Sequence, residues 1–99
     1  MILVVGQFRV PEANLAAIRP PMRKVIAATR CEDGCIDYAY AEDLAEPGLI
    51  RVSEKWRDRA ALTAHFSTAH MAEWQRDRAE LGLYDRNIRI WQVDEGEAV

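Results

Sequence analysis

The amino-acid sequence predicts an α+β fold with the ferredoxin-like order β-α-β-β-α-β, in which an antiparallel sheet carries helices on one face. Two patterns predict it. Short segments contain alternating or continuous apolar residues, and longer segments contain apolar residues at every third or fourth position. The 99 residues suffice for one domain that buries roughly two-thirds of its unfolded surface. We therefore expect residues 1–99 to form a single domain.

The first strand and the first helix are separated by Pro11. Residues 1–10 are rich in β-branched side chains, which is typical of a buried strand. A helical face follows, formed by Leu15, Ile18, Met22, Val25, Ile26 and Thr29. Because proline kinks a helix interior, the pair Pro20-Pro21 predicts a short first turn and then a main helix over residues 20–31.

Two further strands are predicted on either side of a turn at Pro47-Gly48. Residues 35–42 alternate, with Ile36, Tyr38 and Tyr40 on one side. Residues 49–57 also alternate, and one face of this strand carries Ile50, Val52, Glu54 and Trp56. Both strands therefore present aromatic side chains to one face of the sheet.

The second half of the chain predicts two helices and a last strand. Asp58 is placed to cap the first of these helices, which carries Leu62, His65 and Phe66. Ser67 or Thr68 is placed to cap the next helix, which carries His70, Trp74 and Leu81 near one face. Residues 86–93 predict the last strand, and we expect the charged tail after residue 94 to be frayed.

The sheet face without helices is expected to be apolar. The last strand offers Ile88 and Ile90 to one face and Trp91 and Val93 to the other, so either orientation leaves apolar side chains uncovered. Soluble monomers avoid such patches. We therefore expect a homodimer that forms through the uncovered face of the sheet.

Composition and charge exclude several classes of partner. Apolar residues make up 49% of the chain, and 13 basic against 16 acidic residues give a net charge of −3. A mildly acidic chain without a basic cluster argues against nucleic acid and against an anionic membrane surface. No apolar run approaches the ~20 residues that span a bilayer, so we expect a cytoplasmic protein. Cys31 and Cys35 lack the spacing of a redox or zinc motif and are expected to be reduced thiols.

The residues suited to chemistry gather between Tyr38 and Trp74, and no phosphate-binding loop or serine-nucleophile motif is present. Glu54 and Trp56 share a strand face, and His65 follows on the next helix. The three could line an apolar pocket with a group that titrates near neutral pH, suited to a flat aromatic ligand. The alternative is that Trp56 belongs to the core, Glu54 pairs with an arginine and His65 bonds locally.

Further residues are candidates to line this pocket, each with a structural alternative in core packing: Gln7, Tyr38, Phe66, His70 and Trp74. His70 lies five residues after His65, about 140° away on a continuous helix. A metal site on one helix needs a step of four residues. We therefore expect no metal ion.

Several segments, in this order and spacing, resemble the antibiotic biosynthesis monooxygenase family, and most closely its quinol monooxygenase branch: Glu32-Asp33-Gly34-Cys35 with Tyr38, Glu54-Lys55-Trp56, Leu62, Ala64-His65, Thr68, His70-Met71 and Asn87-Ile88-Arg89-Ile90. The resemblance covers nearly the whole chain, although Asp33 stands where the family has proline. It implies a dimeric α+β barrel. It also implies an enzyme that oxidises a small aromatic phenol or hydroquinone with O2, without flavin, haem or metal.

The resemblance also suggests roles for individual residues. His65 is the expected base, because a deprotonated hydroquinone is electron-rich enough to reduce O2 directly. Trp56 would provide an apolar wall, and Glu54 would orient His65. Tyr38 or Gln7 would hold a ligand oxygen.

Other members of the same fold suggest alternatives. Relatives that bind or degrade haem use an asparagine on the first strand, a tryptophan on the third and a histidine on the following helix. Here Gln7 stands in place of the asparagine. Relatives that act on a phosphorylated substrate need cationic groups, for which the strand arginines Arg9 and Arg51 are the candidates. A dimer that binds a small ligand without turnover is a further alternative.

Overall fold

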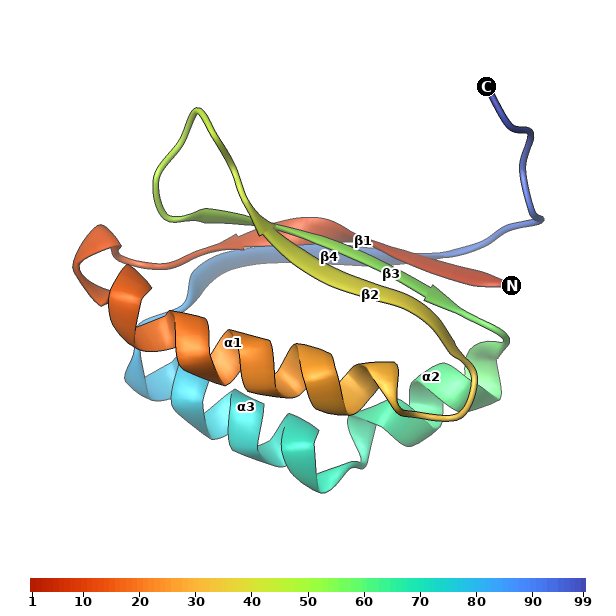
Figure 1. The fold of residues 1–99 in the computed structure, drawn as a ribbon, viewed down its shortest axis with the longest axis horizontal. Coiled ribbons are helices and arrows are strands. Elements are labelled where there is room, and N and C mark those ends of the chain that lie inside the picture. Colours follow the sequence, from red (N-terminus) through yellow and green to blue (C-terminus); the bar gives the residue numbers. More distant parts are fainter.

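The computed structural model describes residues 1–99 and has the predicted α+β architecture (Figure 1). A four-stranded sheet has the order β2-β3-β1-β4, and every pair of neighbours is antiparallel. Its strands are β1 (Ile2–Arg9), β2 (Cys35–Glu42), β3 (Leu49–Trp56) and β4 (Tyr84–Gln92). The helices are the short 3₁₀ helix η1 (Glu12–Asn14), α1 (Leu15–Arg30), α2 (Arg59–Phe66) and α3 (Ala69–Glu80). Helices α1, α2 and α3 all lie on one face of the sheet (Figure 1).

Strand β1 lies at the centre of the sheet and contributes one side of the core. Ile2, Val4 and Phe8 alternate along the helix-covered face and are buried. Gly6 lies between them, opposite Ile88 of β4. A Cβ atom at this position would clash with the backbone of β4, so the close approach of the two strands requires glycine.

Helix α1 begins earlier than predicted, at Leu15 rather than at residue 20, and runs without a break through Pro20 and Pro21. The two prolines remove two backbone hydrogen bonds from the second turn. However, the buried face of Ile18, Met22, Val25 and Thr29 continues on both sides of them. Packing of this face against the sheet and α3 keeps the segment helical, because tertiary contacts override local propensity.

Strand β2 has the predicted bounds, but one part of its predicted face is wrong. Tyr38 is buried and Tyr40 half-buried, whereas Ile36 is 55% exposed. The register between β2 and β3 shifts between Cys35 and Asp37, and such a bulge changes the face to which the following side chains point. On β3 the predicted face is confirmed, because Ile50, Val52, Glu54 and Trp56 are all buried.

The junction between α2 and α3 is fixed by two side-chain caps. Asp58 accepts a hydrogen bond from the Ala61 N–H at 2.9 Å, as predicted. Thr68, rather than Ser67, caps α3 and accepts from the Met71 N–H at 3.3 Å. The Thr68 hydroxyl also donates to the His65 carbonyl oxygen at 2.8 Å. This residue therefore ties the end of α2 to the start of α3.

The opposite face of the sheet carries no helix (Figure 1). Apolar side chains are exposed there, with Val5 38% and Trp91 46% accessible. Ile88 and Ile90 lie on the helix-covered face, since they pair with Gly6 and Val4. Strand β4 begins two residues earlier than predicted, and no regular secondary structure follows it. None of the helices combines the length and apolar character that crossing a bilayer requires.

Candidate functional site

Trp56, Glu54 and His65 come together beneath α2, as the strand pattern predicted. The indole Nε1–H of Trp56 donates to the Glu54 carboxylate at 3.0 Å. The rings of Trp56 and His65 lie with their centroids 4.8 Å apart. All three side chains are buried, because β3 points its helix-facing residues at the underside of α2.

The partner of the His65 ring is Glu32, not Glu54. The His65 Nδ1 lies 2.7 Å from Glu32 Oε2, whereas Glu54 accepts its hydrogen bond from Trp56. The expected role of Glu54 in orienting His65 is therefore corrected. Glu32 lies in the turn after α1, 33 positions before His65. Its only sign in the sequence was its place in the Glu32-Asp33-Gly34-Cys35 junction.

His70 also reaches Glu32, with its Nε2 at 2.8 Å from the same Oε2 atom. The angle of about 140° between the two histidines applies to a continuous helix. The chain breaks at Ser67 and Thr68, as the predicted cap indicated, so His65 lies on α2 and His70 on α3. One carboxylate oxygen thus accepts from two imidazoles.

The hydrogen bond to Glu32 determines which nitrogen of His65 is free. A carboxylate accepts hydrogen bonds only, so His65 Nδ1 carries the proton and Nε2 has the lone pair. Nε2 makes no hydrogen bond. Burial lowers the pKa of His65, and the bond to Glu32 opposes this effect. At neutral pH the ring is therefore an uncharged base held in one orientation by a carboxylate.

A cavity of about 80 Å³ lies beside His65, between the sheet and the helices α2 and α3. Its lining combines apolar walls with His65 and five further groups that can donate or accept a proton or carry charge: Tyr38, Tyr40, Glu54, Arg78 and Arg86. Phe66 and Ile90 also line it and are exposed to solvent. The cavity therefore has a buried floor at His65 and an exposed rim.

Tyr38 and Tyr40 form a pair of phenols in this cavity. Their hydroxyl oxygens lie 2.7 Å apart, and the Tyr38 ring packs edge-on to the His65 ring at 5.5 Å. Burial raises the pKa of Tyr38 far above its usual range and that of Tyr40 to about 12. Both are neutral at pH 7. One hydroxyl donates to the other, so the second keeps a proton that it can donate to a ligand oxygen.

Glu54 is the only carboxylic acid in the cavity lining. Burial raises its pKa to about 7, while the hydrogen bond from Trp56 and the charge of Arg86 oppose the rise. A carboxyl group that titrates near neutral pH in a cavity is a common property of functional sites. Glu54 can therefore exchange a proton with a ligand at physiological pH.

Four of the predicted residues do not line the cavity. Trp56 packs against the His65 ring but is not in the lining, so its expected role as an apolar wall of the pocket is corrected. Gln7 is on the uncovered face of the sheet, where its side chain accepts a hydrogen bond from Arg51, so it cannot reach the cavity. Trp74 is buried in the core against Phe8 and Tyr40. His70 contacts Glu32 but does not line the cavity.

The cationic groups of the cavity are Arg78 and Arg86, which sequence reasoning did not identify. The expected strand arginines are engaged elsewhere: Arg9 pairs with Glu46, and Arg51 pairs with Asp43. Arg78 comes from α3 and Arg86 from the start of β4. Their approach depends on tertiary packing, and no local motif marks it.

The residues of the site could hold a metal ion but fit haem poorly. The donor atoms of Glu32, His65 and His70 lie within 4.8 Å of one another, and imidazole with carboxylate suits first-row transition metals. These are the residues that could hold a metal. Haem fits poorly, because Gln7 lies on the opposite face from Trp56 and His65 and the cavity is only about 80 Å³.

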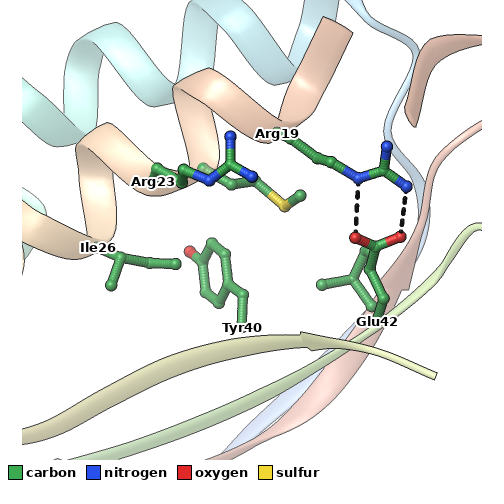
Figure 2. A pocket seen from close by; sticks show the side chains of 7 residues that line it. Arg19, Arg23, Ile26, Tyr40 and Glu42 are labelled. Carbon is green, nitrogen blue, oxygen red and sulfur yellow. Dashed lines mark hydrogen bonds and ion pairs between the residues drawn. The ribbon is translucent and has the colours of Figure 1, made fainter. Parts of the chain in front are cut away.

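A second cavity of about 140 Å³ lies on the other side of Tyr40, between α1 and the sheet (Figure 2). Figure 2 shows the Tyr40 ring pointing toward Arg23 and Ile26 of α1. Arg19 donates to both carboxylate oxygens of Glu42 at 2.9 Å. The lining holds no histidine and no carboxylate other than the paired Glu42, so the acid–base chemistry belongs to the cavity beside His65.

The fold and this site place the chain in a known class. Residues 1–77 match the family model described as antibiotic biosynthesis monooxygenase. The chain belongs to this family. The match extends from β1 through most of α3 and includes His65 and its partner Glu32.

The chain is also similar to individual proteins. The chain is 30% identical over 98 residues to the uncharacterized protein sll1783 of Synechocystis, covering 99% of this chain and 67% of that protein. It is 28% identical over 102 residues to the "Probable quinol monooxygenase YgiN" of Escherichia coli, covering 93% and 97% of the two chains.

Solved structures share the whole fold. A structure from Deinococcus radiodurans that carries the family's name superposes with a TM-score of 0.93 at 25% identity, covering 100% of this chain and 98% of that chain. Rv0793 of Mycobacterium tuberculosis superposes with a TM-score of 0.84 at 26% identity, covering 97% and 98%. The ferredoxin-like arrangement predicted from the sequence is therefore that of the family.

Proposed function

We propose that the protein is a cofactor-independent monooxygenase or quinol oxidase that uses O2 to oxidise a small aromatic phenol or hydroquinone. The observation that carries this proposal is the buried His65, which is hydrogen-bonded through Nδ1 to Glu32, has no hydrogen bond at Nε2, and lines a cavity with both apolar and polar walls. This is the arrangement of a general base oriented by a carboxylate. The family name and the resemblance to YgiN support the same reaction class.

The first step is removal of a proton from a substrate hydroxyl by His65 Nε2. A phenol has a pKa near ~10 and an ordinary histidine one near ~6.5, a gap that costs about 4.8 kcal/mol. The lowered pKa of His65 adds to this cost. A hydrogen bond from the free hydroxyl proton of the Tyr38–Tyr40 pair to the substrate oxygen lowers this cost. The Trp56 ring packs against the His65 ring, and Phe66 supplies an apolar wall at the rim.

The electrons for O2 come from the substrate. The phenolate and O2 combine to form a C–O bond at the ring, and the resulting hydroperoxide loses water to leave a carbonyl. A hydroquinone thereby becomes a hydroxyquinone: one atom of O2 enters the product, and the other leaves as water with two hydrogen atoms of the substrate. Four electrons leave the substrate, so no external reductant is needed. If hydrogen peroxide leaves instead, the products are the quinone and hydrogen peroxide, and two electrons are transferred.

The test is oxygen uptake by the purified protein with 1,4-dihydroxynaphthalene, after treatment with a chelator and with a protein-free blank. We expect uptake above the blank, with one atom of ¹⁸O₂ in the product for monooxygenation or with hydrogen peroxide for oxidase turnover. Uptake equal to the blank for this compound and for a panel of phenols would favour the alternative of a non-enzymatic ligand-binding protein.

The proposal includes a homodimer formed through the uncovered face of the sheet. Val5 and Trp91 are exposed there, with Leu3 half-buried beside them. No helix of the same chain covers this face (Figure 1). A second copy packed on it would bury these side chains, and isologous pairing is the commonest way in which proteins do so.

A further inference from the structure

Two arginines on the rim of the His65 cavity have no partner in the protein. Arg9 of β1 is paired with Glu46, and Arg19 of α1 is paired with Glu42. Arg78 and Arg86 line the same cavity from α3 and β4, yet neither side chain makes a hydrogen bond or an ion pair. Two guanidinium groups thus face one opening without a counter-charge.

The electrostatics of this opening favour an anion. Arg78 is half-buried, and its pKa is lowered by that burial and by the like charge of Arg86. The one carboxyl group of the lining is Glu54, whose pKa of about 7 leaves it only partly ionised at neutral pH. The cavity is therefore positive, although the whole chain has a net charge of −3. An anion that enters reduces the repulsion between the two arginines.

We propose that Arg78 and Arg86 bind a carboxylate carried by the aromatic substrate, so that the protein acts on phenols or hydroquinones with an acid group. A guanidinium group matches a carboxylate in geometry and binds it through two parallel hydrogen bonds. This inference rests on the proposed function for the reaction at the ring. It adds an anion subsite at the rim and with it the substrate class.

The position of the subsite sets the orientation of the ligand. Arg86 is exposed at the rim, whereas His65 is almost fully buried at the floor. A ring held between Phe66 and Ile90 then directs its carboxylate outward and its hydroxyl inward, toward His65. The enclosed 80 Å³ is smaller than typical ligand cavities, so the ring also occupies the opening between these rim side chains.

The first experiment compares two substrates that differ in the acid group, 1,4-dihydroxynaphthalene-2-carboxylate and 1,4-dihydroxynaphthalene. The proteins are the wild type, the double variant Arg78→Gln/Arg86→Gln and the control Arg76→Gln, which removes an exposed charge from the same helix. We expect the double variant to raise KM for the carboxylate about 10-fold to 100-fold and to change KM for the neutral compound less than threefold. The control should match the wild type with both compounds.

The inference is overturned if the double variant remains folded by circular dichroism and its KM rises equally for both substrates. It is also overturned if the KM changes for neither substrate. Equal loss would mean that the arginines serve the reacting oxygen that the two compounds share. No change would mean that the two charges do not contact the ligand.

A second readout does not depend on turnover. Quenching of tryptophan fluorescence measures binding of naphthalene-2-carboxylate and of the neutral naphthalene-2-carboxamide, neither of which can be oxidised at a ring hydroxyl. Tighter binding of the carboxylate that disappears in the double variant supports the subsite even if neither hydroquinone is oxidised. Equal affinity for the two compounds in the wild type overturns the subsite even if both hydroquinones are oxidised.

Discussion

At the residue scale, the proposed chemistry depends on which partner each buried polar side chain has. His65 is bonded through Nδ1 to Glu32, and Glu54 accepts from the Trp56 indole. The two carboxyl groups therefore have separate tasks. Glu32 holds the imidazole in one tautomer, and Glu54 is a second titrating group on the cavity wall.

The pH dependence of turnover tests the role of Glu32. The base must be uncharged, so activity falls as the pH drops through the pKa of His65, which burial holds below 6.5. Glu32 opposes that lowering, so Glu32→Gln should shift the acid limb of kcat/KM to still lower pH and reduce kcat about 10-fold or more through lost orientation. The neighbouring Asp33→Asn, which alters an exposed carboxylate, serves as the control. An acid limb that does not move in Glu32→Gln would remove Glu32 from the mechanism.

The stability of the protein should depend on pH through Glu54. Its pKa is about 7 in the folded state and near 4.3 in an unfolded chain. Between these values the folded protein binds more protons, so the free energy of unfolding falls as pH rises through this window. Glu54→Gln should therefore stabilise the protein by up to about 4 kcal/mol at pH 8 and have little effect at pH 4.

Urea denaturation at the two pH values measures this difference. The control is Glu80→Gln, an exposed carboxyl group at the end of α3, which should change stability little at either pH. An equal effect of Glu54→Gln at pH 4 and pH 8 would contradict a raised pKa.

At the element scale, the site depends on a break between two helices. Thr68 closes α2 through the His65 carbonyl and opens α3 through the Met71 N–H. This break turns His70 back toward Glu32, which a continuous helix would prevent. The cap at Thr68 thus stabilises the junction between the two helices that carry the histidines.

Thr68→Ala should lower the free energy of unfolding by about 1 kcal/mol, since an N-cap hydrogen bond is lost. Thr63→Ala, an exposed position within α2, is the matched control and should stay within about 0.5 kcal/mol of the wild type. Chemical denaturation of the three proteins gives the comparison. Equal stability of Thr68→Ala and Thr63→Ala would show that the cap does not hold the junction.

The sequence predicted the features of these elements that depend on local pattern. Alternation on β3 placed Glu54 and Trp56 on the buried face, and cap chemistry placed the start of α2 at Asp58. The bulge that exposes Ile36 and the helical course through Pro20 and Pro21 were not predicted. Both result from packing between segments that are distant in the chain.

In the candidate site, too, the residues set by local pattern were predicted and those set by long-range packing were not. His65, Glu54 and Tyr38 were predicted and lie at one cavity, because each is on an element whose buried face has a clear period. Glu32, Arg78 and Arg86 were missed, since folding alone brings Glu32 to His65 and brings the two arginines to the cavity. Gln7 was predicted on the wrong face of the sheet. It is the neighbour of Phe8 on β1, and adjacent strand residues point to opposite faces, so a buried Phe8 already indicated that Gln7 faces away from the helices.

At the scale of the whole molecule, the sheet separates the proposed reaction site from the proposed dimer surface. One face holds the helices and the cavity, and the other presents Val5 and Trp91 to solvent. The proposed dimer would use the second face and leave the first free for the substrate. The 99 residues then supply both a reaction site and an assembly surface.

Analytical ultracentrifugation tests the assembly. We expect the wild type to sediment as a dimer and Trp91→Lys to shift it toward the monomer, because a charge would be buried at the interface. Leu44→Lys makes the same kind of change at a fully exposed loop position and should leave the dimer intact. A wild-type monomer at high concentration, or a Trp91→Lys variant that remains dimeric, would contradict pairing through this face.

The most direct test of the central claim is oxygen uptake with 1,4-dihydroxynaphthalene at pH 7 by the wild type and by His65→Asn. The asparagine amide keeps a donor for Glu32 in the place of Nδ1 but has no lone pair in the place of Nε2. We predict that His65→Asn keeps the wild-type fold and loses about 10²-fold to 10⁴-fold in kcat, as expected for removal of a general base. Uptake within twofold of the wild type in a folded His65→Asn variant would contradict the account.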